Sequence, residues 1–222
     1  MLNLRRPMHL LFVFILCFAG VPVAGATDLQ AFFVAVQVDS AASVKSMIGK
    51  GVDPDSRDPR SGETALIIAL REESMNVFNV LLADPRVELE LAAPNGNTPL
   101  MMAAFKGNKP AVLALLGKGA AVNRSGWSPL HYAAAGGSAD VASILIERGA
   151  TLDALAPSDL TPLMMAAREG QESTVAVLLA AGANATLANG EGLTAAQLAE
   201  RADKPRIVEA INSHPRRIPP AR

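Results

Sequence analysis

The chain of 222 residues has little cysteine, few aromatic residues and almost no net charge. Its single cysteine excludes an intrachain disulfide framework. Aromatic residues make up only 4% of a chain that is 50% apolar, so alanine and the aliphatic residues must build the core. Twenty lysines and arginines against 21 aspartates and glutamates give a net charge of -1, which argues against a general nucleic-acid binder with a basic face.

The first 26 residues have the three-part pattern of an export signal. Two arginines at positions 5 and 6 precede an unbroken apolar run over residues 10–18. Ala24 and Ala26 place small residues at the -3 and -1 positions of a cleavage site before Thr27. A retained membrane anchor is the alternative, but it needs about 20 apolar residues, and this run is shorter. We therefore predict cleavage after Ala26 and no membrane insertion of the mature chain.

Cleavage would also remove Cys17, the only thiol. A chain without cysteine has nothing to mispair in an oxidising compartment. Together with the alanine-rich composition, this favours a bacterial protein that is exported to the periplasm or secreted.

The remainder of the chain repeats one motif. Thr-Pro-Leu-Met-Met-Ala-Ala occurs at residues 98–104 and again at 161–167, and Ser-Pro-Leu-His-Tyr-Ala-Ala lies between them at 128–134. Looser copies begin at Thr64 and Thr194, so that the successive spacings are 34, 30, 33 and 33 residues. A second apolar stretch follows each of the first four copies.

This pattern resembles the ankyrin repeat, which has a 33-residue period and a T-P-L-H-x-A signature. The resemblance covers about residues 28–211 and implies an all-α solenoid of helix-turn-helix units, joined by fingers that are short β-turns or hairpins. It implies about six repeats within residues 27–213, the first and last being degenerate caps, and leaves 214–222 as a disordered basic tail. Proteins of this family are non-catalytic scaffolds that hold another protein along the concave face and finger tips.

Elementary physical chemistry agrees with the resemblance. Threonine or serine at the start of each motif can cap a helix, and the proline that follows suits the first helical position. No unit can bury its apolar face alone, so neighbouring units must stack. Most copies have a glycine two residues before the capping residue, where a tight turn is expected, but Asp159 takes that place in the fifth unit, so its turn should differ.

Residues that could carry chemistry are few. His131 occupies the histidine position of the motif, where the imidazole is expected to form structural hydrogen bonds. Asp53, Asp55 and Asp58 alternate in one finger, but the run lacks the glycine and the distal glutamate of a calcium loop. The Met-Met pairs at 101–102 and 164–165 lie two units apart, about 20 Å, which is too far for one copper ion.

We therefore predict no catalytic residue, no metal and no cofactor. The alternatives to a scaffold are a metal-binding or stress-protective envelope protein, or a hydrolase hidden in the repeats.

The repeat register predicts where a partner protein would bind. In this family the residues four and seven positions after the capping residue face the groove, and here they are largely apolar, aromatic or arginine. The spacing of 30 also shortens one finger, which carries Arg124 and Trp127. Arginine and aromatic residues are common in binding hot spots. The predicted partner-binding residues of this monomeric protein are Ile68, Arg71, Met102, Phe105, Arg124, Trp127, Tyr132, Met165 and Arg168. The alternative is that Trp127 and Phe105 only fill the gap beside the short finger.

Overall fold

The computed structural model describes residues 26–214, which form twelve α-helices in six antiparallel pairs. The pairs are α1 (Ala26–Gln37) with α2 (Ala41–Gly49), α3 (Ala65–Arg71) with α4 (Met75–Ala83), α5 (Pro99–Phe105) with α6 (Lys109–Gly117), α7 (Pro129–Gly136) with α8 (Ala139–Glu147), α9 (Pro162–Glu169) with α10 (Glu172–Ala180), and α11 (Ala195–Arg201) with α12 (Pro205–Ser213). The predicted all-α repeat fold is confirmed. The predicted export signal, apart from Ala26, and the predicted basic tail, apart from His214, lie outside the described residues.

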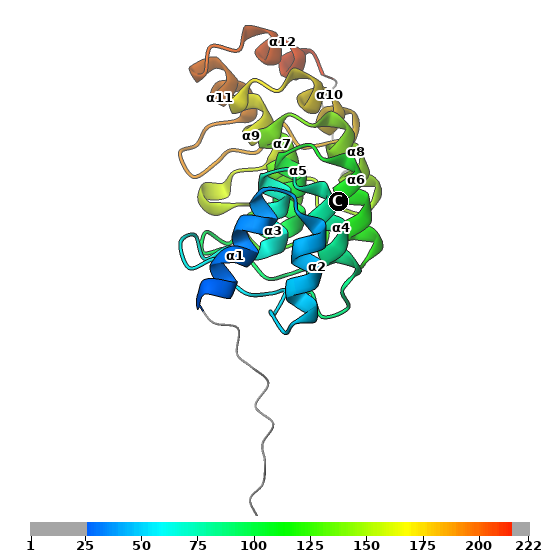
Figure 1. The fold of residues 1–222 in the computed structure, drawn as a ribbon. Coiled ribbons are helices and arrows are strands. Elements are labelled where there is room, and N and C mark those ends of the chain that lie inside the picture. Colours follow the sequence, from blue (N-terminus) through cyan, green and yellow to red (C-terminus); the bar gives the residue numbers. More distant parts are fainter. Residues whose placement is uncertain (1–25, 215–222) are drawn as a thin grey trace, which may run out of the picture.

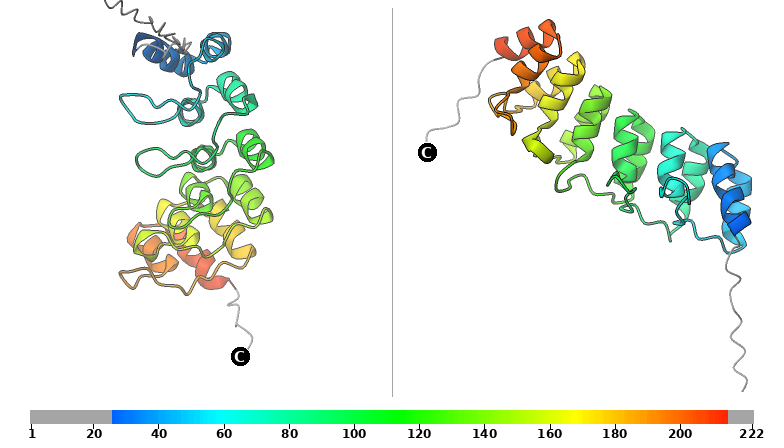
Figure 2. Two further views of the ribbon diagram at one scale, coloured as in Figure 1. Left: turned by 90° about the horizontal axis from the view of Figure 1, so that it is seen from below. Right: turned by 90° about the vertical axis from the view of Figure 1, so that its left-hand side faces the viewer.

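The six pairs stack side by side into an elongated array (Figures 1 and 2). The first helices of the pairs form one row and the second helices form a parallel row. The loops between units, which we call fingers, project from the row of first helices (Figure 2). The five fingers are residues 50–64, 84–98, 118–128, 148–161 and 181–194. Within residues 26–214 no helix has the length and apolar composition that crossing a membrane requires.

The fingers contain turns and isolated antiparallel bridges in place of extended hairpins. The three bridges found in the described part of the chain join Arg57 to Thr64, Ala156 to Leu160, and Ala188 to Thr194. In the fourth finger, Asp159 has a φ of 56° and lies in a short 3-10 helix, η1 (Pro157–Asp159). The turn of the fifth unit therefore differs from the others, as its missing glycine predicts.

The repeated threonines begin the helices as expected. The Thr98 hydroxyl accepts a hydrogen bond from the Met101 amide at 3.3 Å, and the Met101 sulfur accepts one from the Thr98 amide at 3.4 Å. Thr161 and Met164 repeat this arrangement in α9. Because each thioether satisfies a backbone donor at a helix start, Met101 and Met164 cap their own helices.

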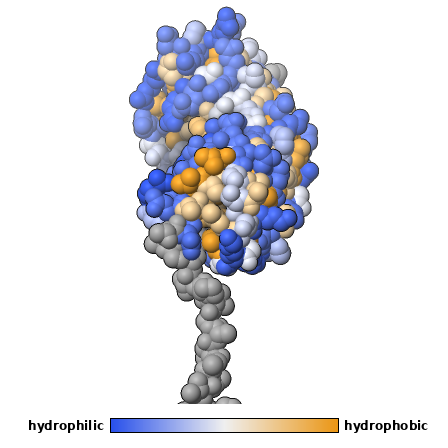
Figure 3. All heavy atoms as spheres, in the orientation of Figure 1, coloured by the Kyte–Doolittle hydropathy of each residue, from blue (hydrophilic) through white to orange (hydrophobic). Residues whose placement is uncertain are grey.

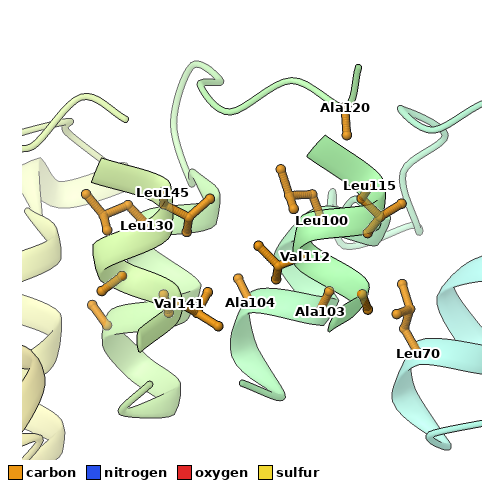
Figure 4. Packing of buried hydrophobic residues seen from close by; sticks show 14 of the residues in the cluster. Leu70, Leu100, Ala103, Ala104, Val112, Leu115, Ala120, Leu130, Val141 and Leu145 are labelled. Carbon is orange, nitrogen blue, oxygen red and sulfur yellow. The ribbon is translucent and has the colours of Figure 1, made fainter. Parts of the chain in front are cut away.

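Aliphatic residues from neighbouring units form one continuous core. Leu100 of one unit points toward Leu145 of the next, while Leu115 lies on the opposite side, toward Leu70 of the preceding unit (Figure 4), and all of these side chains are almost fully buried. Ala103 and Ala104 are also buried in this core, where their small side chains permit a short distance between helices. The stack is thus held together by contacts between units rather than within them.

The two end units differ in polarity. In the last unit, Glu191 and Arg201 are exposed and form an ion pair of 2.8 Å, in agreement with the predicted polar cap. The first unit buries Phe32 and Phe33, but it leaves Val34 on α1 47% exposed and Val38, directly after α1, 68% exposed. This gives the N-terminal end of the stack the apolar surface that is visible over α1 and α2 in Figure 3.

Candidate functional site

Three aromatic residues gather in the middle of the array, between the third and fourth units. The Tyr132 ring lies 6.4 Å from the Phe105 ring and 6.3 Å from the Trp127 ring, in edge-to-face geometry in both cases. Phe105 is 47% exposed, while Trp127 and Tyr132 are partly buried. We call these three residues the aromatic cluster. All three are among the partner-binding residues predicted from the repeat register and the short finger.

The short finger, residues 118–128, positions the cluster. Its Asn123 binds the following finger, donating to the Gly149 carbonyl at 2.8 Å and accepting from the Thr151 amide at 2.8 Å. Its Arg124 donates to the Gly96 carbonyl of the preceding finger at 3.2 Å. Polar side chains therefore tie the short finger to both neighbours, and Trp127 lies where the finger rejoins α7.

His131 lies beneath the cluster and is fully buried. Its Nδ1 accepts hydrogen bonds from the amide and hydroxyl of Ser128, at 3.2 and 2.8 Å, so the proton belongs on Nε2, which donates to the Leu160 carbonyl at 2.9 Å. Burial lowers the pKa of His131, and the hydrogen bond to Leu160 only partly opposes this. Both nitrogens are used within the fold, which confirms the structural role predicted for this residue.

Tyr132 connects the third and fourth units. Its hydroxyl donates to the Asn97 side-chain oxygen. Partial burial raises the pKa of Tyr132, and the hydrogen bond to Asn97 opposes that change. The hydroxyl therefore stays protonated at neutral pH, and the ring is held in one orientation beside Phe105.

The predicted partner-binding residues are exposed only in part. Ile68 is 0% and Met165 is 7% exposed, so the prediction that these two side chains are accessible to a partner was wrong. The Arg168 side chain, one helical turn further on, covers Met165, because it donates to the Met165 sulfur at 3.4 Å. Arg71 occupies the equivalent position after Ile68 and pairs with Glu63.

The middle units lack such an arginine cover. The corresponding positions there are Phe105 and Ala135, and the Met102 and Tyr132 side chains remain partly exposed. The accessible part of the predicted site is therefore the aromatic cluster together with Met102 and the exposed Arg124.

The acidic finger has a structural role that the sequence did not reveal. Asp55 accepts from the Glu88 amide of the next finger at 2.9 Å. The same contact recurs along the array, from Glu90 to Ala121, from Asn123 to Thr151 and from Asp153 to Asn184. Burial raises the pKa of Asp55 despite this hydrogen bond. The sequence does show a polar residue near the start of each finger, but the amide that this residue binds lies in another unit.

Over residues 26–214, no group of three or more His, Cys, Asp or Glu side chains is arranged to hold a metal ion. Asp53 accepts from the Asp55 amide at 3.0 Å and Asp58 from the Arg60 amide at 3.2 Å, so both carboxylates stabilise local turns.

Comparison with known proteins agrees with the fold. The family described as "Ankyrin repeats (3 copies)" matches residues 32–125, 73–156 and 121–189, and the chain belongs to this family. Two crystal structures are similar. One is the ankyrin-repeat domain of Bcl-3, with a TM-score of 0.67, 26% identity, and coverage of 82% of this chain and 81% of that chain. The other is an ankyrin-repeat domain from Acinetobacter baumannii, with a TM-score of 0.69, 25% identity, and coverage of 82% and 96%.

Curated relatives share only this domain. Human transient receptor potential cation channel subfamily A member 1 is 32% identical over 118 residues, which are 52% of this chain and 10% of the channel. Mouse neurogenic locus notch homolog protein 1 is 29% identical over 139 residues, which are 61% of this chain and 6% of that protein. The match thus spans a tenth or less of either relative. Ankyrin-repeat homologues are protein-interaction modules, and the family is generally non-catalytic.

Proposed function

We propose that this protein is a non-catalytic scaffold of the bacterial cell envelope that works as a monomer and binds another protein through the groove and finger tips. The aromatic cluster is the observation that carries the proposal. Phe105 is 47% exposed at a groove position that a paired arginine, Arg71 or Arg168, holds in the second and fifth units. Exposed aromatic residues held by a rigid scaffold are typical centres of protein interfaces.

Crosslinking in living cells, followed by mass spectrometry of the attached proteins, tests the proposal. We expect Phe105→Ala, alone and combined with Tyr132→Ala, to leave the helical circular dichroism signal intact and to weaken capture of the partner. Leu113→Ala is a matched control, because Leu113 is 39% exposed on α6, in the row of second helices. Capture that is equal in folded wild-type and variant proteins would show that the partner uses another surface.

The envelope location rests on the basic head, the short apolar run and the small residues before Thr27. N-terminal sequencing of the protein from fractionated cells tests it. We expect a mature chain that begins at Thr27 in the periplasm or the medium. Soluble cytoplasmic protein with an intact Met1 would refute export.

A further inference from the structure

Arg124 has no acidic partner within residues 26–214, unlike the cations at the ends of the first helices α3, α5 and α9. Arg71 pairs with Glu63 and Glu72, Lys106 with Glu73, and Arg168 with Glu169. Arg124 forms no ion pair with any residue in the range 26–214, and its one hydrogen bond goes to the Gly96 carbonyl. A guanidinium group has five N–H donors in a planar fork, so most of its donors remain available to a carboxylate from outside.

This cation lies beside the aromatic cluster. Arg124 binds the carbonyl of Gly96, and the Tyr132 hydroxyl binds the side chain of Asn97, the next residue along the same turn. Consecutive Cα atoms are about 3.8 Å apart, so these two contacts keep the guanidinium and the tyrosine hydroxyl within roughly 12 Å of each other. Phe105 continues the surface on the other side of the Tyr132 ring, at 6.4 Å between ring centroids.

The finger that carries Arg124 is also the shortest in the array, as a comparison of residues 118–128 with residues 84–98 and 148–161 shows. Because it is shorter, this finger can cover less of the surface in front of the first helices, at the place where the cation and the aromatic rings lie. A chain segment that crosses the first helices here can contact both the aromatic cluster and the guanidinium.

From this juxtaposition we infer that the partner presents an extended, acidic segment to the short finger. One bulky apolar side chain of that segment packs on Phe105 and Tyr132, and an aspartate or glutamate a few residues away pairs with Arg124. An extended chain advances about 3.3 Å per residue, so on the order of three to five residues separate the two anchors. This inference rests on the proposed function and adds the chemistry of the partner to it.

The probe is a phage-displayed library of random 12-residue peptides, selected on the protein produced from the full-length chain. We expect the selected peptides to be enriched in Asp or Glu at a fixed distance from an aromatic or aliphatic residue. Synthetic copies are then titrated against the protein, and the fluorescence of Trp127, the only tryptophan, reports binding. Arg124→Gln should raise the Kd about fivefold at low salt, and the difference should shrink as salt is added.

A charge reversal makes the test independent of folding defects. Selection on Arg124→Glu should recover peptides with Lys or Arg at the position where the wild-type protein selects an acid. Lys50→Gln is the control, because Lys50 is an exposed cation that has no ion pair within residues 26–214 and follows α2, in the first unit. It should leave both the selected sequences and the Kd unchanged.

Two outcomes would overturn the inference. One is a set of peptides without acidic preference, or with a Kd that Arg124→Gln leaves unchanged. The other is the absence of peptides that bind the wild-type protein better than a Phe105→Ala, Arg124→Gln double variant. Either result leaves the scaffold proposal to its own test, because partner capture in cells is measured with separate variants.

Discussion

Gly136, the last residue of α7, is the position where a single methyl group should cause the largest disturbance beside the aromatic cluster. A Cβ at this position would overlap the carbonyl oxygen of Phe105 and come within 3.0 Å of its carbonyl carbon. Both atoms are backbone, so no side chain can rotate away. Gly136→Ala therefore forces α5 and α7 apart at the point where they carry the two halves of the cluster.

The expected cost follows from two opposing effects. Overfilling a well-packed interface costs about 1–3 kcal/mol, and contact with rigid backbone puts this site at the upper end. Replacing a helical glycine by alanine gains about 0.5–1 kcal/mol. The net effect should be a loss of about 2 kcal/mol in the free energy of unfolding. The Trp127 emission should also change, because α7 carries Tyr132 against the indole ring.

Urea unfolding, followed by far-ultraviolet circular dichroism and by Trp127 fluorescence, measures this loss. Gly117→Ala is the matched control, since Gly117 also ends a helix, α6, but an added Cβ there meets nothing within 4 Å. The control should be neutral or slightly stabilising. If Gly136→Ala lies within about 0.5 kcal/mol of the wild type, the close approach of α5 and α7 is wrong.

Three further predictions concern the interior. His131→Gln should reduce the loss of stability on acidification. Because burial lowers the pKa of the imidazole, the unfolded chain binds the proton more readily than the folded chain does. The wild type therefore loses stability as the pH falls below about 6.5, and the variant should lose less. Glutamine suits the position because Gln197 accepts a hydrogen bond from the Thr194 amide, as His131 does from the Ser128 amide. Urea midpoints at pH 7.5 and pH 5 give the comparison. Thr174→Val should raise the urea midpoint by the equivalent of about 1 kcal/mol, because the buried Thr174 hydroxyl has no hydrogen-bond partner in the described part of the chain. Leu145→Ala should cost about 2–5 kcal/mol in the same assay, since Leu145 is fully buried, and a cost below about 0.5 kcal/mol would contradict the repeat register.

The sequence predicted the features of this fold that depend on neighbouring residues in the chain. Thr98 caps α5 through residues three positions away, and the missing glycine at Asp159 changes a turn of a few residues. Contacts between units were harder to predict. The bond from Asp55 to the Glu88 amide and that from Tyr132 to Asn97 each join two units, and no single repeat contains both partners. The stacking of alike units was predictable, but these individual contacts were not.

The extent of the candidate site depends on contacts between residues of a single helix. The register placed Ile68, Met165 and Tyr132 at equivalent positions, yet only Tyr132 is accessible to a partner. Arg168, one turn further on, lies over Met165, and Arg71 takes the same position after Ile68, whereas Ala135, in that position after Tyr132, is too short to cover the ring. Exposure of a groove residue in this array is therefore set by a pair of positions, the residue itself and the one three places later. By this rule the proposed partner surface lies on the middle units, where the covering positions hold alanine and phenylalanine, whereas paired arginines hold them in the second and fifth units.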